Sequence, residues 1–161
     1  MPVELRERVI RRMSSTRWPD LDRPRRAATP AELAASEREL EFPLPPAVVD
    51  FYTSVANGGG GFLGLLNGAT DDLGNNAITL YAMFMNPPEP EPDPEYTPTQ
   101  WRWFEAVVPI YYWGCNTYSC VDRTGRMVGR DSFAWVSDGR TFEEWLSEWA
   151  DGVLQQPSNR P

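Results

Sequence analysis

Hydrophobic residues at the start of the chain recur with the spacing of an amphipathic helix. Leu5, Val9 and Met13 each lie four residues apart, which predicts a helix over residues 2–14 with one apolar face. The stretch that follows, residues 14–28, contains two prolines, and we expect it to be a linker.

Residues typical of helix N-termini predict two further helices. Residues 29–32 (TPAE) combine a capping box with proline at the first helical position, and the helix they open should end before Pro43. The prolines at 45–46 begin another helix, which we expect to end in a left-handed turn at residues 57–58, Asn-Gly. The glycines that follow should allow a sharp turn into a short strand over residues 62–66.

In the middle of the chain, one apolar segment lies between two segments that are expected to be loops. Residues 67–76 carry turn-forming side chains and should form a loop. Residues 77–85 fit either a helix or a buried strand, and the available cap at Asn76 favours the helix. Residues 86–98 interleave prolines with acids, which predicts an extended, polyproline-like loop.

The last third predicts four strands and one helix. Apolar runs are separated by turn signals, of which residues 122–125 (DRTG) are the clearest. A second capping box, residues 141–144 (TFEE), opens a helix that should end at Gly152. We expect the strands at residues 107–113, 118–122, 127–130 and 133–136.

The pattern divides the chain into three parts. Residues 1–28 form a basic helix and linker, residues 29–152 a domain that includes the acidic, proline-rich loop 86–98, and residues 153–161 a flexible tail. The 161 residues are enough for a sizeable core. Because no apolar run approaches the roughly 20 residues of a membrane span and no secretory leader is visible, we expect a cytoplasmic protein without membrane contact.

The basic residues narrow the range of functions. The sequence contains no histidine, and all 15 of its Lys and Arg positions are arginine, which removes the commonest general base and metal ligand and all lysine chemistry. The net charge of −8 is uneven, with +4 in residues 1–26 and −12 in residues 27–161. An acidic body repels nucleic acid and attracts basic partners. We therefore predict a non-enzymatic protein that needs no cofactor and binds no nucleic acid.

Neither the cysteines nor the glycine run indicates a chemical site. Cys115 and Cys120 are too few for zinc without histidine, and they lack redox-pair spacing. We expect no metal site and two buried thiols on the strands of one hairpin. Residues 57–61 (NGGGG) lie between a helix and a strand, the reverse of a phosphate-binding loop, so we interpret them as a structural turn.

Paired acids offer no acid–base site either. Glu143 and Glu144 are adjacent on a helix and cannot face one cleft together. Asp71 and Asp72 lack the spacing of a calcium loop. We expect both pairs to be solvated.

Aromatic residues gather just before and within the predicted strands. Two thirds of these rings are expected in the core, and the remainder, close to acids, would suit a protein interface with aromatic anchors and a charged rim. The cluster comprises Trp101, Trp103, Phe104, Tyr111, Tyr112, Trp113 and Tyr118.

The segment from the second helix to the glycine turn, ERELEFPLPPAVVDFYTSVANGGGG, resembles the SMI1/KNR4 (SUKH) superfamily. The later VVPIYYWGCNTYSCVDRTGRMV is similar to the central strands of that family, and TFEEWLSEW to its closing helix. The likeness covers about residues 29–152. The matching positions in the first segment are Glu37, Leu44, Pro45, Pro46, Phe51, Tyr52, Asn57 and Gly58.

The resemblance implies an α+β fold, with a small, twisted, mainly antiparallel sheet and helices packed against it. Many bacterial members of the family are immunity proteins that bind and neutralise a cognate toxin, often a nuclease or deaminase, whereas eukaryotic members are regulatory scaffolds. The family supplies no general catalytic residues to carry over to this chain.

We therefore expect an immunity protein whose partner is a basic toxin; the alternative is a regulatory scaffold without a toxin partner. The acidic loop 86–98 is longer than the resemblance to the family implies; either it contributes to partner specificity or it is a neutral insertion. An acidic, partly aromatic face would cover a basic active cleft. The predicted partner-binding residues are Asp71, Asp72, Glu89, Glu91, Asp93, Glu95 and Trp101.

Overall fold

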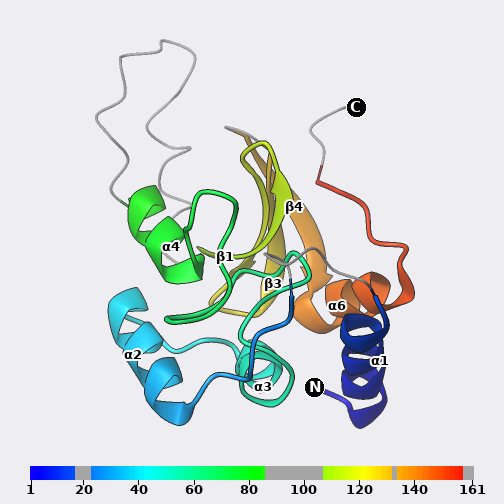
Figure 1. The fold of residues 1–161 in the computed structure, drawn as a ribbon. Helices are drawn as coiled ribbons and strands as arrows, with labels where there is room; N and C mark the ends of the chain where they lie inside the picture. The colour runs from blue at the N-terminus through cyan, green and yellow to red at the C-terminus, as the bar shows by residue number, and fades with distance from the viewer. Residues whose placement is uncertain (17–22, 86–106, 132–133, 158–161) are drawn as a thin grey trace.

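A computed structural model of the chain describes residues 1–16, 23–85, 107–131 and 134–157. This part contains five helices and an antiparallel sheet with the strand order β1-β2-β3-β4 (Figure 1), the α+β arrangement that the sequence predicts. The helices are α1 (Val3–Ser15), α2 (Pro30–Leu40), α3 (Pro46–Ser54), α4 (Ala77–Met85) and α6 (Phe142–Asp151). The strands are β1 (Val107–Gly114), β2 (Thr117–Asp122), β3 (Arg126–Asp131) and β4 (Ala134–Thr141).

Local side-chain signals set most of the helix boundaries. Both predicted capping boxes form, with Thr29 and Glu32 at the start of α2 and Thr141 and Glu144 at the start of α6. The side-chain oxygen Oδ1 of Asn76 accepts hydrogen bonds from the backbone N–H groups at positions 78 and 79, at 3.0 and 2.9 Å. This cap confirms the helical alternative for residues 77–85.

Two predictions near the glycine run are wrong. α3 ends at Ser54 rather than at residues 57–58, and the left-handed residue is Gly58. Residues 62–66 do not form a strand: Phe62 makes one isolated bridge to Tyr111. The reason is that side chains bind the backbone N–H groups of residues 65 and 66 and so remove them from sheet pairing.

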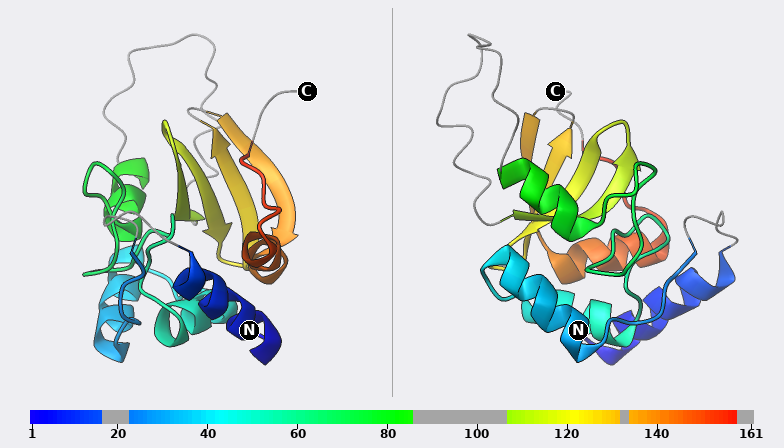
Figure 2. Two further views of the ribbon diagram at one scale, coloured as in Figure 1. Left: turned by 45° about the vertical axis from the view of Figure 1, so that its right-hand side comes forward. Right: turned by 60° about the vertical axis from the view of Figure 1, so that its left-hand side comes forward.

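The sheet is covered on two sides (Figure 2). Neighbouring residues of a strand point to opposite faces, and Tyr111 and Tyr112 separate the two environments. Tyr111 lies against Trp145 of α6, with 5.4 Å between ring centroids. Tyr112 lies on the side of Tyr118, whose ring packs edge-on against Phe84 of α4 at 5.7 Å. β4 extends to Thr141, beyond the predicted strand at 133–136.

The N-terminal helix packs on the domain. Leu5, Val9 and Met13, the predicted apolar face, are all buried, and α1 contacts α6 (Figure 1). The end of the predicted linker is also attached, because its backbone groups at residues 25, 26 and 28 hydrogen-bond with residues 58, 57 and 52. Within the described part of the chain, no helix is both long and apolar enough to span a membrane.

Candidate protein-binding surface and the polar network behind it

The acidic loop before α4 is organised by Asp71. Its carboxylate accepts hydrogen bonds from the backbone N–H groups of Leu73 at 2.9 Å and Asn75 at 2.8 Å, and from the Asn75 side chain at 3.3 Å. The residue is only 8% exposed. Asp71 is therefore not the solvated acid that we expected: its carboxylate is used to hold the loop.

Asp72 is exposed and reaches the sheet. Burial, and after it the interaction with the Asp72 carboxylate, raises the pKa of Tyr112 in β1. The next residue, Leu73, is 76% exposed. The loop thus presents a carboxylate and a large apolar side chain side by side.

Beneath this loop, aromatic rings join α4 to the sheet. Tyr112 and Tyr118 are 5.3 Å apart, and the guanidinium of Arg130 lies 4.1 Å from the centroid of Phe84. Burial, with the charge of Asp71 as a smaller cause, raises the pKa of Tyr118 to about 12. At neutral pH this hydroxyl is protonated and uncharged. We therefore interpret the aromatic cluster as packing that holds α4 against the sheet.

α4 itself has no charged residue, and one of its sides is exposed at Thr79 and Met83, the latter to 55%. Together with Asp72 and Leu73 these residues define what we call the α4 face. Of the seven predicted partner-binding residues, Asp72 lies on this face, whereas Asp71 is buried and holds the loop that presents it. The other five, Glu89, Glu91, Asp93, Glu95 and Trp101, lie outside the described residues.

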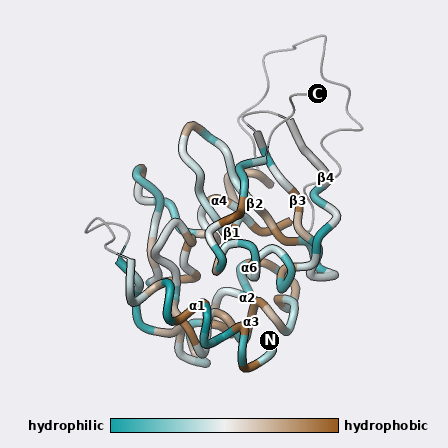
Figure 3. The backbone as a smooth tube through the Cα atoms, turned by 90° about the vertical axis from the view of Figure 1, so that its right-hand side faces the viewer, coloured by the Kyte–Doolittle hydropathy of each residue, from teal (hydrophilic) through white to brown (hydrophobic). Residues whose placement is uncertain are grey.

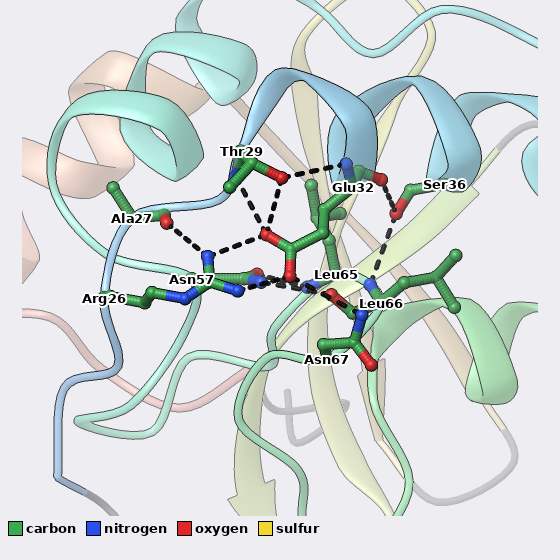
Figure 4. Close-up of polar contacts among 9 residues, drawn as sticks. All are labelled: Arg26, Ala27, Thr29, Glu32, Ser36, Asn57, Leu65, Leu66 and Asn67. Atoms are coloured by element: carbon green, nitrogen blue, oxygen red, sulfur yellow. Dashed lines mark hydrogen bonds and ion pairs between the residues drawn. The ribbon is translucent and has the colours of Figure 1, made fainter.

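A polar network, buried at Asn57 and Ser36, joins α2 to the loop that follows the glycine run (Figure 4). The Asn57 side chain, in a residue only 1% exposed, accepts from the Leu65 N–H at 2.7 Å and donates to the Leu66 carbonyl at 3.2 Å. The hydroxyl of Ser36 accepts from the Leu66 N–H and donates to the carbonyl of Glu32. The network thus ties α2 to the loop that follows the glycines.

The carboxylate of Glu32 completes the network. It accepts from the guanidinium of Arg26 at 2.8 and 2.5 Å while closing the capping box with Thr29. The hydrogen bond from Arg26 is the largest cause that lowers the pKa of Glu32, to about 2. The sequence predicted the capping box but not the ion pair of Glu32 with Arg26. The resemblance singled out Asn57 only as a motif position, and Ser36 carries no sequence signal.

The glycines permit close backbone approach, which confirms that the run is a structural turn. Gly59 has a φ of +98°, and an added Cβ would lie 2.5 Å from the carbonyl oxygen of Arg23. At Gly61, φ +88°, it would lie 2.5 Å from the ring of Tyr111. Both positions therefore require a residue without a side chain.

The prediction of two buried cysteines is correct for Cys120 and wrong for Cys115. Cys120 is buried in β2, and burial raises the pKa of its thiol. Cys115 is exposed, contrary to expectation, because it lies with Asn116 in the tight turn between β1 and β2, where both residues have positive φ. Among the described residues, no group of three or more His, Cys, Asp or Glu side chains is placed to hold a metal ion.

Other expected surface acids also have partners. Glu144 closes the capping box of α6, and Glu143 lies 3.4 Å from the N-terminal ammonium group. Glu37, one of the positions that carry the family resemblance, accepts from the backbone N–H of Leu44 at 2.9 Å. These carboxylates stabilise helix ends and turns.

Comparisons with known proteins agree with this architecture. No curated protein and no solved structure matches the chain. A family model, that of the SMI1/KNR4 family (SUKH-1), matches residues 27–149, from just before α2 to near the end of α6. The match covers well over half of the chain and includes the α4 face and every residue of the polar network except Arg26. The chain therefore belongs to the SMI1/KNR4 family (SUKH-1).

Proposed function

We propose that this chain is a non-catalytic immunity protein that binds and neutralises a basic bacterial toxin of the nuclease or deaminase class. The observation that carries the proposal is the composition of the α4 face. Exposed apolar side chains, Leu73 and Met83, lie on the same loop–helix unit as the exposed carboxylate of Asp72. Apolar anchors with a charged rim are typical of protein interfaces, and family membership supports the same class of function.

The mechanism is stoichiometric coverage. The acidic side of the α4 face pairs with basic residues around the toxin's active cleft, and the bound protein excludes nucleic acid from it. Electrostatic complementarity raises the association rate more than the final affinity. Asp71 contributes indirectly, since its hydrogen bonds fix the loop that presents Asp72.

The acidic segment 86–98 extends the proposal beyond the described surface. This segment directly follows α4 in the sequence and contains four acids close in sequence to Met83: Glu89, Glu91, Asp93 and Glu95. Trp101 follows as an aromatic anchor. We propose these residues as further partner contacts.

The first experiment is affinity capture with the tagged full chain from its host. The captured proteins are then assayed with and without an equimolar amount of this protein. One dominant basic partner with nuclease or deaminase activity that this protein abolishes at a 1:1 ratio would support the proposal. Several unrelated cellular proteins and no toxin would instead support the regulatory scaffold.

The second experiment tests the surface. Asp72→Arg should slow association with the captured toxin and weaken its dependence on salt, because attraction becomes repulsion. Glu7→Arg is the matched control: it reverses an exposed charge on α1, at the other end of the molecule (Figure 1). Equal kinetics in the two variants would remove the α4 face from the interface.

A further inference from the structure

The N-terminal helix precedes the residues that the family model matches. The match covers residues 27–149, whereas α1 covers Val3–Ser15 and lies against α3 and α6 (Figure 3). Except for the end of α6, the surface that α1 covers lies within the matched residues. We call this surface the α3–α6 face; it is defined by Asp50, Glu143, Ser147, Trp149 and Asp151.

Charge is divided cleanly between the two sides of this contact. Arg6 binds both carboxylate oxygens of Asp50 at 2.8 Å, and Arg8 binds those of Asp151 at 2.6 and 2.8 Å. Arg8 also donates to the hydroxyl of Ser147. In each of these pairs the cation belongs to α1 and the anion or acceptor to the domain.

The end of α6 adds to the complementarity. The guanidinium of Arg12 lies 4.8 Å from the centroid of the Trp149 ring, and close to Gly152, which caps the helix. A cation is favoured both over an indole ring and at a helix C-terminus. The α3–α6 face thus recognises an arginine-rich helix with one apolar side.

α1 is stabilised more by packing on this face than by capping interactions of its own. It has no side-chain cap at its N-terminus, and its C-terminal flanking residue is extended, whereas α2 and α6 both have capping boxes. A helix of 13 residues is marginal in isolation. The pair between Arg8 and Asp151 is well exposed and therefore weak. A competing helix needs to replace mainly the contacts of Leu5, Val9 and Met13.

We propose that the α3–α6 face is a second protein-docking site, for a basic amphipathic helix of a partner, and that α1 occupies it in cis. The occupant follows from charge complementarity and from the helix already seated there. α1 then acts as a tethered competitor that lowers the partner's apparent affinity. This site is separate from the α4 face and does not depend on the toxin proposal.

The test uses a labelled peptide of residues 2–16 as the probe and the full chain as the receptor. Val9 is fully buried, so Val9→Asp should expel α1 from the face, whereas Ile10→Asp, at a position that is 40% exposed, is the matched control and should leave it seated. By anisotropy, the peptide should bind V9D at least about tenfold more tightly than I10D or the wild type, since only V9D has a vacant face.

A second pair of variants tests recognition. In the V9D background, Asp50→Arg with Asp151→Arg should weaken peptide binding by about tenfold or more. The equal charge change Glu39→Arg with Glu41→Arg, in the last turn of α2 and at its C-cap, should leave it within about twofold. Four results would overturn the proposal: a V9D chain that does not fold, equal binding to V9D and I10D, binding indifferent to the Asp50 and Asp151 reversals, or a wild-type dimer that exchanges α1 between two copies.

Discussion

Asn57 and Asp71 perform the same kind of task in two different loops, and the comparison shows how context decides its importance. Each side chain accepts hydrogen bonds from backbone N–H groups and so holds a turn. Asn57 binds residues 65 and 66 with its side chain and residues 26 and 69 with its backbone, so it joins three distant segments. Asp71 closes only its own loop, with residues 73–75.

The difference indicates that stability and partner binding depend on different loops of this molecule. Asn57 and its partner Leu65 are buried, so a backbone group that loses its bond there has no access to water. The Asp71 loop lies at the surface, where water can replace a lost bond. We therefore expect changes around Asn57 to act on folding and changes around Asp71 and Asp72 to act on recognition.

The largest effect should come from glycine substitutions, one in each loop. Gly59→Ala places a methyl group 2.5 Å from the backbone of Arg23 and Pro24 at a positive φ, and overpacking together with strain should cost about 4 kcal/mol. Gly74→Ala, in the Asp71 loop, has φ +85° but nothing within 4 Å. Strain alone should cost about 1 kcal/mol there. Urea unfolding followed by tryptophan fluorescence measures both.

Equal losses at Gly59 and Gly74 would contradict this difference between the loops. Gly61→Ala gives an intermediate point, because the added methyl would meet the Tyr111 side chain rather than backbone. We expect its loss of unfolding free energy to fall between the other two.

Truncation of the two polar side chains should give the second largest effect. Asn57→Ala leaves the buried N–H of Leu65 and the half-buried carbonyl of Leu66 without this partner and should lower the free energy of unfolding by about 3 kcal/mol. Asp71→Ala removes bonds that water can replace and should cost about 1 kcal/mol. A loss at Asp71 as large as that at Asn57, in the same urea experiment, would show that the surface loop is part of the folding core.

The sequence predicts those parts of the fold that local signals determine. Both capping boxes, the Asn76 cap and the apolar side of α1 involve residues within a few positions of each other, and each was correctly predicted. The strand expected at 62–66 was wrong because its backbone is bound by Asn57 and Ser36, from 8 and 30 positions away. Local pattern carries no information on such contacts.

In the candidate site, too, the sequence predicted the local features but not the contacts between distant residues. Turn chemistry and charge indicated Asp71 and Asp72 as a loop, but the division of roles between them depends on distances within the folded chain. The apolar stripe of α1 predicted a buried side without saying that α6 would cover it. The acidic partners of its arginines are more than 40 residues away in sequence, so no local pattern connects them.

A pH experiment tests the exposed end of the polar network, where Glu32 pairs with Arg26. The pKa of Glu32 is lowered to about 2 from an unfolded value of 4.5, so its ionised form stabilises the folded state above pH 4.5. That contribution is lost as the pH falls from about 4.5 towards 2. Glu32→Gln should therefore lower the unfolding midpoint at pH 6, and the difference from the wild type should shrink as the pH falls through this window. A constant difference would show that the loss is steric.

The smallest effect on stability is expected at Asp72, and it is the most informative for function. Asp72→Asn keeps the shape of an exposed side chain, so the free energy of unfolding should change by less than about 0.5 kcal/mol. The pKa of Tyr112 should fall, because burial remains as the main cause of its raised value but the adjacent negative charge is gone. Titration of the tyrosine ring carbons by NMR measures this shift residue by residue, with Tyr52, buried in the core, as an internal control that should not move. A stable variant with a lowered Tyr112 pKa and slower toxin association would place recognition in the surface loop, whereas an unchanged Tyr112 would show that Asp72 does not reach the sheet in solution.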